Sequence, residues 1–196
     1  MDEIVIRSML KWPDVPSVYG WLALDRRGDW RIKTAGGRFD RVTNRAVIAF
    51  IGRNYGADAE GRWYFQNGPQ RVFVALDYTP WIYRLDESGG GVATHTGKAP
   101  QDLLGAWIDE SGALLLQSEL GVGAVSDRDL PALIERIQNE TGRSAEALLE
   151  AAAGRDGAEC IMFGHRLRVG CIRSDQVPGR FGFIARPAPR PGEREC

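Results

Sequence analysis

Few residues of this sequence are suited to acid–base or nucleophilic chemistry. The two histidines are His95, in a segment rich in Gly and Thr, and His165, at a predicted hairpin turn. Neither has a second His or a Cys at metal-ligand spacing, so we expect no metal site. A histidine that met Asp109 or Asp77 in the fold would act as a general base, but no Gly-x-Ser-x-Gly elbow supplies a nucleophile. We therefore expect no catalytic residues, and a hydrolase or transferase that uses His95 or His165 is the alternative.

Three glycine-rich segments match phosphate-binding loops only in part. Gly89-Gly90-Gly91 is followed by Val92 and lacks the Gly-Lys-Ser/Thr that holds phosphates. Gly97-Lys98-Ala99 lacks the hydroxyl, and Gly121-x-Gly123 lacks the third glycine of a dinucleotide loop. We interpret the first segment as a linker and expect no cofactor.

The three cysteines, Cys160, Cys171 and Cys196, form no Cys-x-x-Cys pair and are too few for a disulfide scaffold. A hairpin that turns near Gly164 and His165 would place Cys160 and Cys171 on one face, either opposite each other or diagonal. We expect reduced thiols that pack in the core.

Aromatic residues are the more informative group, because the chain has six tryptophans. Large aromatic side chains dominate burial, so we expect most of them in the core, with Trp12 and Trp81 partly exposed. Exposed aromatic rings beside Arg71 and Arg84 would stack a planar anion, and plain packing is the alternative. The candidate ligand-binding residues, which we expect between two lobes, are Tyr64, Arg71, Phe73, Tyr78 and Trp81.

Basic residues gather between Arg26 and Arg45, where they outnumber Asp29 and Asp40. Such a stretch is able to meet a phosphate backbone. A nucleic-acid footprint normally comes with a strongly basic domain, so we interpret the stretch as a solvated hairpin and do not expect nucleic acid. We expect a small anionic or planar ligand, and a protein partner is an alternative.

The composition is that of an ordinary globular protein. Of 196 residues, 43% are hydrophobic and 26% are charged, and the formal net charge is -1. The sequence has no run of about 18 apolar residues, and its first residues, Met1 to Ile4, are acidic where a signal peptide is positively charged. We therefore expect a cytoplasmic protein that contacts no membrane.

Apolar alternation and turn residues predict short elements in the first half. Residues 17–34 form a predicted hairpin, and a helix follows from Thr43 or Asn44 to a stop at Gly56. Residues 81–85 form a later predicted strand.

Asn67-Gly68 predicts a type I′ turn within a hairpin of residues 62–74, which would pair Trp63 with Val72. One face of this hairpin then carries the predicted core residues Trp63, Phe65, Val72, Val74 and Leu76. The other face carries Tyr64, Arg71 and Phe73.

The second half repeats this order of elements after a glycine-rich joint. It has predicted hairpins at 103–117 and 159–172, a helix that begins at Ser126 or Asp127, and a further helix from Ser144 to about residue 153. Asp25 and Gly28 align with Asp109 and Gly112. The sequence thus predicts an α+β fold in which a duplicated hairpin-helix-hairpin repeat forms two packed lobes.

The expected boundaries follow from this order. They are an N-terminal arm at 1–16, a first repeat at 17–85, the joint at 86–101, a second repeat at 102–185 and a proline-rich, frayed tail at 186–196.

Several motifs of the first half also form a family pattern. They are Asp25-x-x-Gly28-x-Trp30, Thr43-Asn44, Phe50-Ile51, and Gly61-Arg62-Trp63-Tyr64-Phe65 through Val72-x-Val74. With them the chain resembles the proteobacterial domain of unknown function 1285, best over residues 20–85. The Asn67-Gly68-Pro69-Gln70 turn departs from that pattern, so a sister family is the alternative.

The resemblance implies a two-lobe α+β fold and a role in signal transduction or regulation, and it brings no catalytic residues. We therefore predict a bacterial, non-enzymatic protein that is regulatory or binds a small ligand. A protein-interaction module that uses the proline-rich tail is a second alternative, beside the enzyme.

Overall fold

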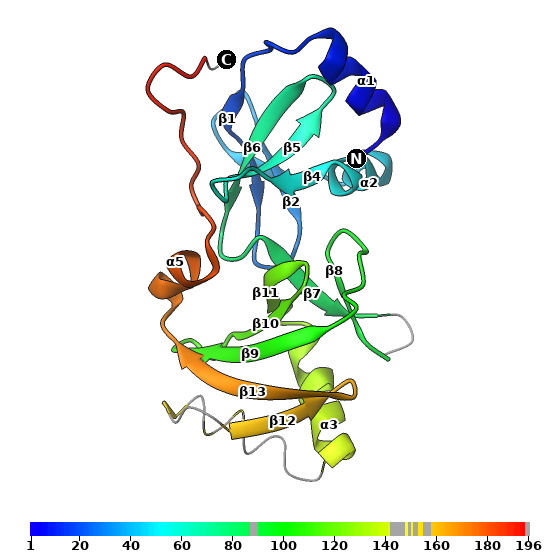
Figure 1. The fold of residues 1–196 in the computed structure, drawn as a ribbon, viewed down its shortest axis with the longest axis vertical. Helices are drawn as coiled ribbons and strands as arrows, with labels where there is room; N and C mark the ends of the chain where they lie inside the picture. Colours follow the sequence, from blue (N-terminus) through cyan, green and yellow to red (C-terminus); the bar gives the residue numbers. More distant parts are fainter. Residues whose placement is uncertain (87–89, 142–147, 149, 151–152, 155–157, 195–196) are drawn as a thin grey trace. The chain divides into compact units, whose positions relative to one another are not determined.

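The computed structural model describes residues 1–86, 90–141, 148, 150, 153–154 and 158–194. The chain forms two compact units (Figure 1). Unit 1 is Met1–Pro80 with Gly182–Cys196, and unit 2 is Trp81–Phe181. Each unit is built on a sheet of its own with few helices, so the predicted α+β class is confirmed.

Unit 1 holds a six-stranded sheet of order β3-β2-β1-β6-β5-β4. Its elements are α1 (Glu3–Lys11), β1 (Val18–Leu24), β2 (Trp30–Lys33), β3 (Phe39–Arg41), α2 (Arg45–Arg53), β4 (Tyr55–Ala57), β5 (Trp63–Asn67) and β6 (Gln70–Leu76). The central pair β1 and β6 is parallel, and the other pairs are antiparallel.

One face of this sheet is the core of unit 1. Leu22 pairs with Val74 and Leu24 with Leu76, and all four side chains are buried. Helix α2 covers the same face, because the Phe50 ring meets the Phe65 ring edge-on at 5.4 Å. The Asn44 side chain caps α2 by accepting from the N–H groups of Ala46 and Val47, as the sequence predicted.

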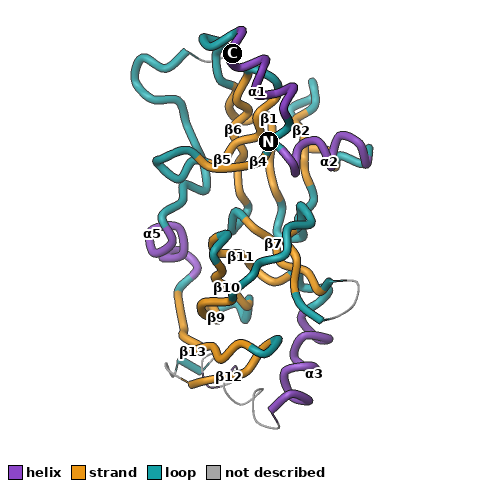
Figure 2. Tube along the Cα trace, turned by 45° about the vertical axis from the view of Figure 1, so that its right-hand side comes forward, coloured by secondary structure: helices purple, strands orange, loops and turns teal. Residues whose placement is uncertain are grey.

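Unit 2 holds a seven-stranded sheet of order β12-β13-β9-β10-β11-β7-β8 (Figure 2). Its strands are β7 (Trp81–Leu85), β8 (Val92–Thr94), β9 (Leu103–Asp109), β10 (Leu114–Ser118), β11 (Gly121–Val125), β12 (Ala158–Met162) and β13 (His165–Ile172). Its helices are α3 (Leu130–Thr141), the 3-10 helix η1 (Ser174–Gln176) and α5 (Val177–Phe181).

The two sheets have a similar strand topology. In unit 1 the last strand, β6, lies parallel to β1, which begins the first meander, and in unit 2 the last strand, β13, lies parallel to β9. In both units a helix lies between the meander and the closing hairpin. The order of elements agrees with the predicted repeat, and an internal duplication stays a prediction.

A recurring aspartate turn joins several strands. Asp25, Asp58 and Asp109 each begin a turn whose fourth residue is a glycine with φ between 77° and 82°. In each turn the aspartate N–H donates to the carbonyl four residues later, and the carboxylate accepts N–H groups inside the turn. The side chain thus satisfies backbone donors that the tight turn leaves free.

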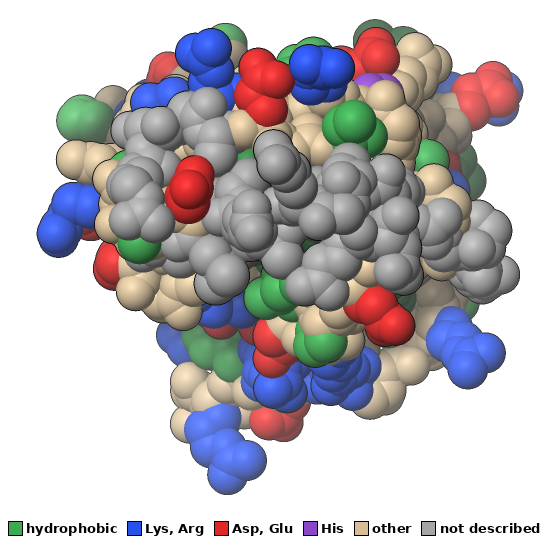
Figure 3. Space-filling model, turned by 90° about the horizontal axis from the view of Figure 1, so that it is seen from below, with side chains coloured by type: hydrophobic (Ala, Val, Ile, Leu, Met, Phe, Trp, Pro, Cys, Tyr) green, Lys and Arg blue, Asp and Glu red, His purple; other side chains and the backbone are tan. Residues whose placement is uncertain are grey.

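The two units differ in charge. Unit 1 carries 15 Lys or Arg against 11 Asp or Glu, whereas unit 2 carries 10 against 15. On the coloured part of the face in Figure 3, basic and acidic side chains are interspersed. The near-neutral total therefore hides a basic unit 1. In the described part of the chain, no helix is both long and apolar enough to cross a membrane.

Several local predictions are wrong. Helix α2 ends at Arg53, and Gly56 lies in strand β4 without a positive φ, so it is no helix stop. The β5–β6 turn is Gly68-Pro69, since Asn67 pairs with Gln70 and Phe65 with Val72. Gly68 has φ 59° and Asn67 stays extended in β5, which suits a type II′ rather than a type I′ turn.

The predicted faces of that hairpin survive, because the register differs by two residues and the side-chain alternation has a period of two. Seven elements were not expected: helix α1 within the N-terminal arm, the strands β3, β4, β8 and β11, the 3-10 helix η1 and helix α5. Strand β11 also occupies the Gly121-x-Gly123 segment. The predicted helix from Ser144 to about residue 153 lies mainly outside the described residues.

The cysteine geometry also differs from the prediction. The β12–β13 hairpin pairs Cys160 with Leu167, so Cys171 is neither opposite nor diagonal to it. Neither Cys160 nor Cys171 forms a disulfide bond. Cys160 is buried, as expected, and burial raises the pKa of its thiol to about 11. Cys196 lies outside the described residues.

Candidate functional site

Three of the predicted ligand-binding residues lie together on the sheet of unit 1. The Arg71 guanidinium is 4.8 Å from the centroid of the Tyr64 ring, and the Tyr64 ring meets Phe73 edge-on at 5.9 Å. Tyr64 and Arg71 are half-buried, whereas Phe73 is 1% exposed. The Phe73 ring is covered by the Tyr19 ring, which stacks on it at 4.5 Å, so Tyr64 and Arg71 are the groups that a ligand would reach.

The other two predicted ligand-binding residues, Tyr78 and Trp81, are buried, as Phe73 is. Tyr78 lies in unit 1 beneath Arg26, whose guanidinium is 4.2 Å from the ring centroid. Trp81 lies in unit 2, where its Nε1–H donates to the Leu120 carbonyl at 2.7 Å. Trp81 is 3% exposed, so the expectation that it is partly exposed is wrong, whereas Trp12 is exposed as expected.

The residues of the enzyme alternative hold structural contacts. The His95 Nδ1 accepts from the Ile82 N–H at 3.3 Å, and the His95 ring lies 5.7 Å from Trp81. The Asp109 carboxylate is buried within its own turn, and the Asp77 carboxylate is 3.3 Å from Arg186. Among the described residues no group of three or more His, Cys, Asp or Glu is placed to hold a metal ion.

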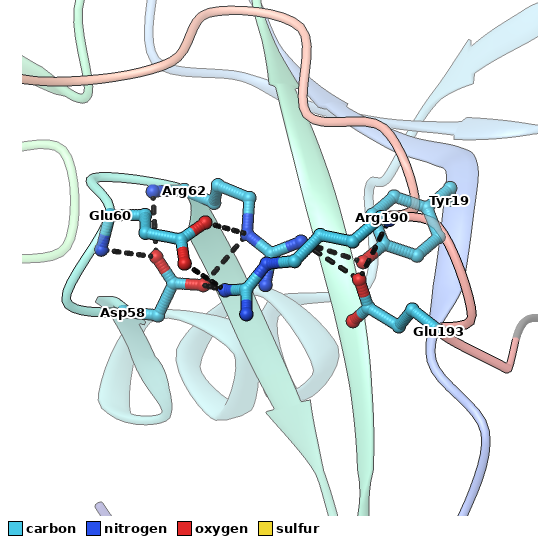
Figure 4. A network of polar contacts seen from close by, with 6 residues as sticks. All are labelled: Tyr19, Asp58, Glu60, Arg62, Arg190 and Glu193. Atoms are coloured by element: carbon cyan, nitrogen blue, oxygen red, sulfur yellow. Dashed lines mark hydrogen bonds and ion pairs between the residues drawn. The ribbon is translucent and has the colours of Figure 1, made fainter.

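A network of ion pairs fastens the proline-rich segment to unit 1 (Figure 4). Arg62, whose side chain is 5% exposed, donates to Asp58 at 2.8 Å and to Glu193 at 3.0 Å. Arg190 is 2.6 Å from Glu60. Residues before and within this segment also join the unit through backbone bonds, from Leu76 to Ala185 and from Ser17 to Arg194. The segment is held, and the expected fraying is wrong.

A hollow with both aromatic and basic walls lies on the sheet of unit 2, and we call it the Trp107 groove. It has a volume of ≈ 490 Å³. Its lining residues are Leu104, Gly105, Trp107, Gln117, Arg168, Val169, Gly170, Cys171 and Arg180. Strands β9, β10 and β13 and helix α5 supply them.

Glycines create the hollow beside the indole. Gly105 pairs with Gln117 and Gly170 pairs with Trp107, so these residues lie side by side on adjacent strands. A Cβ on Gly105 would lie 2.7 Å from Cη2 of Trp107. The Trp107 ring therefore needs a glycine at position 105 to lie where it does, since carbon atoms do not approach so closely.

Two arginines line this groove. The Arg180 guanidinium is 5.3 Å from the centroid of the Trp107 ring, and Phe181 meets that ring edge-on at 5.1 Å. Arg168 pairs with Glu159 in the sheet register, but the Glu159 carboxylate makes its ion pair with Arg166. Within the described part of the chain, neither Arg168 nor Arg180 has a carboxylate partner. Both guanidiniums are thus available to an anion.

Sequence reasoning missed this groove. Trp107, Arg168 and Arg180 come from three elements, so no spacing in the sequence joins them. The one local signal is Gly105, two residues before Trp107 within a strand, because a glycine inside a strand often marks a close approach.

Comparison with curated protein sequences finds no match. Among solved structures, the chain is similar to a DUF1285 family protein from Silicibacter pomeroyi DSS-3, with a TM-score of 0.42 and 14% identity over 61% of this chain and 69% of that one. It is also similar to a DUF1285 family protein from Shewanella baltica OS155, with a TM-score of 0.41 and 13% identity over 62% of this chain and 93% of that one. Both belong to the family that the sequence motifs resemble.

A different family matches the sequence itself. The DUF2944 family, described as a protein of unknown function (DUF2946), matches residues 1–188. Because this match spans nearly the whole chain, the protein belongs to the DUF2944 family.

Proposed function

We propose that this protein binds a small planar anion in the Trp107 groove and acts by binding rather than by turnover. The observation that carries the proposal is the meeting of an indole ring with two guanidiniums that have no carboxylate partner among the described residues. A guanidinium binds carboxylate or phosphate oxygens with paired N–H donors. The indole offers a flat apolar surface to a ring.

The dimensions of the groove suit a small molecule. Its volume of ≈ 490 Å³ lies within the range of ligand pockets, which is roughly 300–1,000 Å³. The Gln117 amide lies on the same face as Gly105 and adds a donor and an acceptor that would orient the ligand.

The charge of unit 2 favours a compact anion over a polyanion. With 10 basic against 15 acidic residues, unit 2 as a whole repels an extended chain of negative charge. The attraction is local, at Arg168 and Arg180, so one carboxylate or phosphate group is the fitting size.

The groups that line the groove are suited to binding. Guanidiniums stay protonated at neutral pH and an amide does not ionise, so neither acts as a general base. A role in regulation, which we expected from the sequence, is compatible with such binding without turnover.

The test measures thermal unfolding of the full chain with a panel of aromatic carboxylates and nucleoside monophosphates. Each anion is compared with its uncharged counterpart, an aromatic amide or a nucleoside. We expect at least one anion to raise Tm, since a ligand at about 100 times its Kd adds roughly 2.7 kcal/mol, which is several degrees for a domain of this size. The uncharged counterpart should add less.

The variants Trp107→Ala and Arg180→Gln should abolish the shift. Matched controls are Trp12→Ala, which removes an exposed indole in unit 1, and Arg166→Gln, which removes an exposed guanidinium of β13 that lies outside the groove. The proposal is overturned if no anion shifts the Tm of the unaltered protein, or if the shift persists in both groove variants.

A further inference from the structure

We propose that the face of the unit 1 sheet opposite α2 is a binding surface for single-stranded nucleic acid. Its bases would stack on Trp21, Phe39 and Tyr64, and its phosphates would meet Lys33 and Arg71. We call these five residues the aromatic-basic face. The inference is independent of the Trp107 groove, because its residues all belong to unit 1.

The outer half of this face is an exposed row of three side chains. Lys33 pairs with Phe39 across β2 and β3, and the Lys33 Nζ lies 5.9 Å from the centroid of the Trp21 ring. Trp21 is 46% exposed and Phe39 is 38% exposed. An isolated exposed apolar residue needs no explanation, but two aromatic rings that flank a lysine on one sheet face form a stacking surface.

The inner half of the row follows from the strand register. Leu22 pairs with Val74 and points into the core, so the preceding residues, Trp21 and Phe73, point to the other face. Phe73 meets Tyr64 on β5, and Arg71 lies over the Tyr64 ring. Two of the residues that the sequence indicated for ligand binding, Tyr64 and Arg71, thus lie on the same sheet face as Trp21 and Phe39. Between them, the Phe73 ring is covered by the Tyr19 ring at 4.5 Å and by the Arg62 guanidinium at 4.5 Å.

The spacing of the row suits a strand of bases. Neighbouring strands of a sheet lie about 4.8 Å apart, so aromatic side chains on β3, β1 and β5 are spread across the sheet. Single-stranded RNA is bound in this manner by sheets whose exposed aromatic residues stack two or three bases.

The charge of the unit is complementary to phosphate. Unit 1 has 15 basic against 11 acidic residues, an excess that the opposite charge of unit 2 conceals in the whole sequence. Among the described residues, Lys33 and Arg71 make cation–π contacts and no ion pairs. Arg31 and Arg41 lie nearby on β2 and β3 and stay partly exposed although they pair with Asp25 and Asp29.

These features together favour a single strand over other polyanions. A duplex or an acidic peptide would meet the lysine and arginines, but neither offers unpaired bases to the aromatic rings. The expectation from the sequence, that nucleic acid is not a partner, rested on the lack of a strongly basic domain. The structure places the basic excess in unit 1, with 15 basic against 11 acidic residues.

The experiment measures the fluorescence anisotropy of a fluorescein-labelled 12-nucleotide oligo(dT) with the full chain. We expect the affinity to fall as salt rises from 50 to 200 mM, because bound phosphates release counterions. Trp21→Ala should weaken binding about tenfold or more, since stacking on one aromatic ring accounts for that much. Lys33→Gln should weaken binding and reduce the dependence on salt.

A matched control exists at Trp12, the residue that follows helix α1. Trp12 is 57% exposed and has Lys11 at 5.6 Å from its ring, which reproduces the Trp21–Lys33 pair away from the sheet face. Trp12→Ala should leave the affinity unchanged, and circular dichroism should show that each variant is folded. The proposal is overturned if the unaltered protein does not bind the oligonucleotide at 50 mM salt, if Trp21→Ala binds as tightly, or if polyglutamate or duplex competes equally well.

Discussion

Arg62 and Glu193 form an ion pair with an N–O distance of 3.0 Å between residues 131 positions apart in the sequence. Arg62 lies between the turn carboxylate of Asp58 and the C-terminal segment, and its guanidinium also lies 4.5 Å from the Phe73 ring. The same guanidinium donates to the Tyr19 hydroxyl at 3.1 Å. The Glu193 carboxylate thus holds the C-terminal segment to unit 1, because it compensates the nearly buried charge of Arg62.

Glu193→Gln should therefore lower the free energy of unfolding. Loss of one partner of a buried ion pair leaves the other charge poorly compensated, and because Asp58 remains we expect about 1–3 kcal/mol. Urea unfolding measures this value. The matched control is Glu159→Gln, which removes an exposed pair with Arg166 at 3.4 Å and should cost less than about 0.5 kcal/mol. Equal effects of the two changes would contradict a structural role for Glu193.

The same carboxylate should make stability depend on acid pH. Burial by itself would raise the pKa of Glu193, but hydrogen bonds from the Arg190 N–H, Tyr19 and Arg62 lower it to about 2. A glutamate in the unfolded chain has a pKa of about 4.3, so the contribution of Glu193 is complete above that pH and is lost as pH falls toward 2.

The measurement compares urea unfolding of the unaltered protein and Glu193→Gln from pH 5 to pH 2. The difference between their free energies of unfolding should shrink over this window and stay constant above it. Burial and the contact with Glu193 also raise the pKa of Tyr19 to about 12, so a second loss is expected only when pH rises above about 10. A difference that does not change with acid pH would show that Glu193 acts through its shape and not its charge.

Local patterns were the predictable part of this fold. Asp25 and Gly28 are three residues apart, as are Asp109 and Gly112, and the aspartate turn requires this spacing. The sequence therefore indicated the hairpins at 17–34 and 103–117 correctly. The hairpin at Gly68 was assigned to the right segment with the wrong register. Asn67-Gly68 and Gly68-Pro69 both suit two-residue turns, and packing against the rest of unit 1 decides between them.

The sites were less predictable, because their parts are distant in the sequence. Arg180 contacts Trp107 because α5, which follows β13, places it there, and no periodicity in the sequence predicts that contact. Phe73, Tyr78 and Trp81 carry the right chemistry for a ligand, but aromatic rings have more surface to bury than most side chains, and here they are buried. The exposed pair Trp21 and Phe39 depends on strand β3, which is too short for its alternation to be detected.

Gly105→Ala should disturb the Trp107 groove without a change of charge. The new Cβ would lie 2.7 Å from the Trp107 ring, so the ring must move, at a cost of about 1–3 kcal/mol. Thermal unfolding and the Trp emission spectrum measure the two consequences. Gly56→Ala is the matched control, because Gly56 also lies in a strand and nothing lies within 4 Å of its Cβ position. A normal emission spectrum in Gly105→Ala would contradict the role of Gly105 as the space for the indole.

Substitutions of Asp109 distinguish a structural role of its carboxylate from a catalytic one. Asp109 Oδ1 accepts from the N–H groups of Ser111 and Ala113 and from the Ser111 hydroxyl at 2.6–2.9 Å. An asparagine oxygen accepts the same bonds, so Asp109→Asn should keep most of the stability. Asp109→Ala leaves the buried donors unmatched and should cost about 2–3 kcal/mol in urea unfolding.

A catalytic aspartate would behave differently. Both Asp109→Asn and Asp109→Ala remove its charge, so both would abolish activity, and the two variants would differ little in stability. Asp102→Ala, at an exposed aspartate that precedes β9, is the control and should change stability by less than about 0.5 kcal/mol. If Asp109→Asn unfolds as readily as Asp109→Ala, the negative charge rather than the acceptor oxygen stabilises this turn. Asp109 would keep a structural role in that outcome too, because a charge that stabilises the fold is not one that the fold holds at a cost for catalysis.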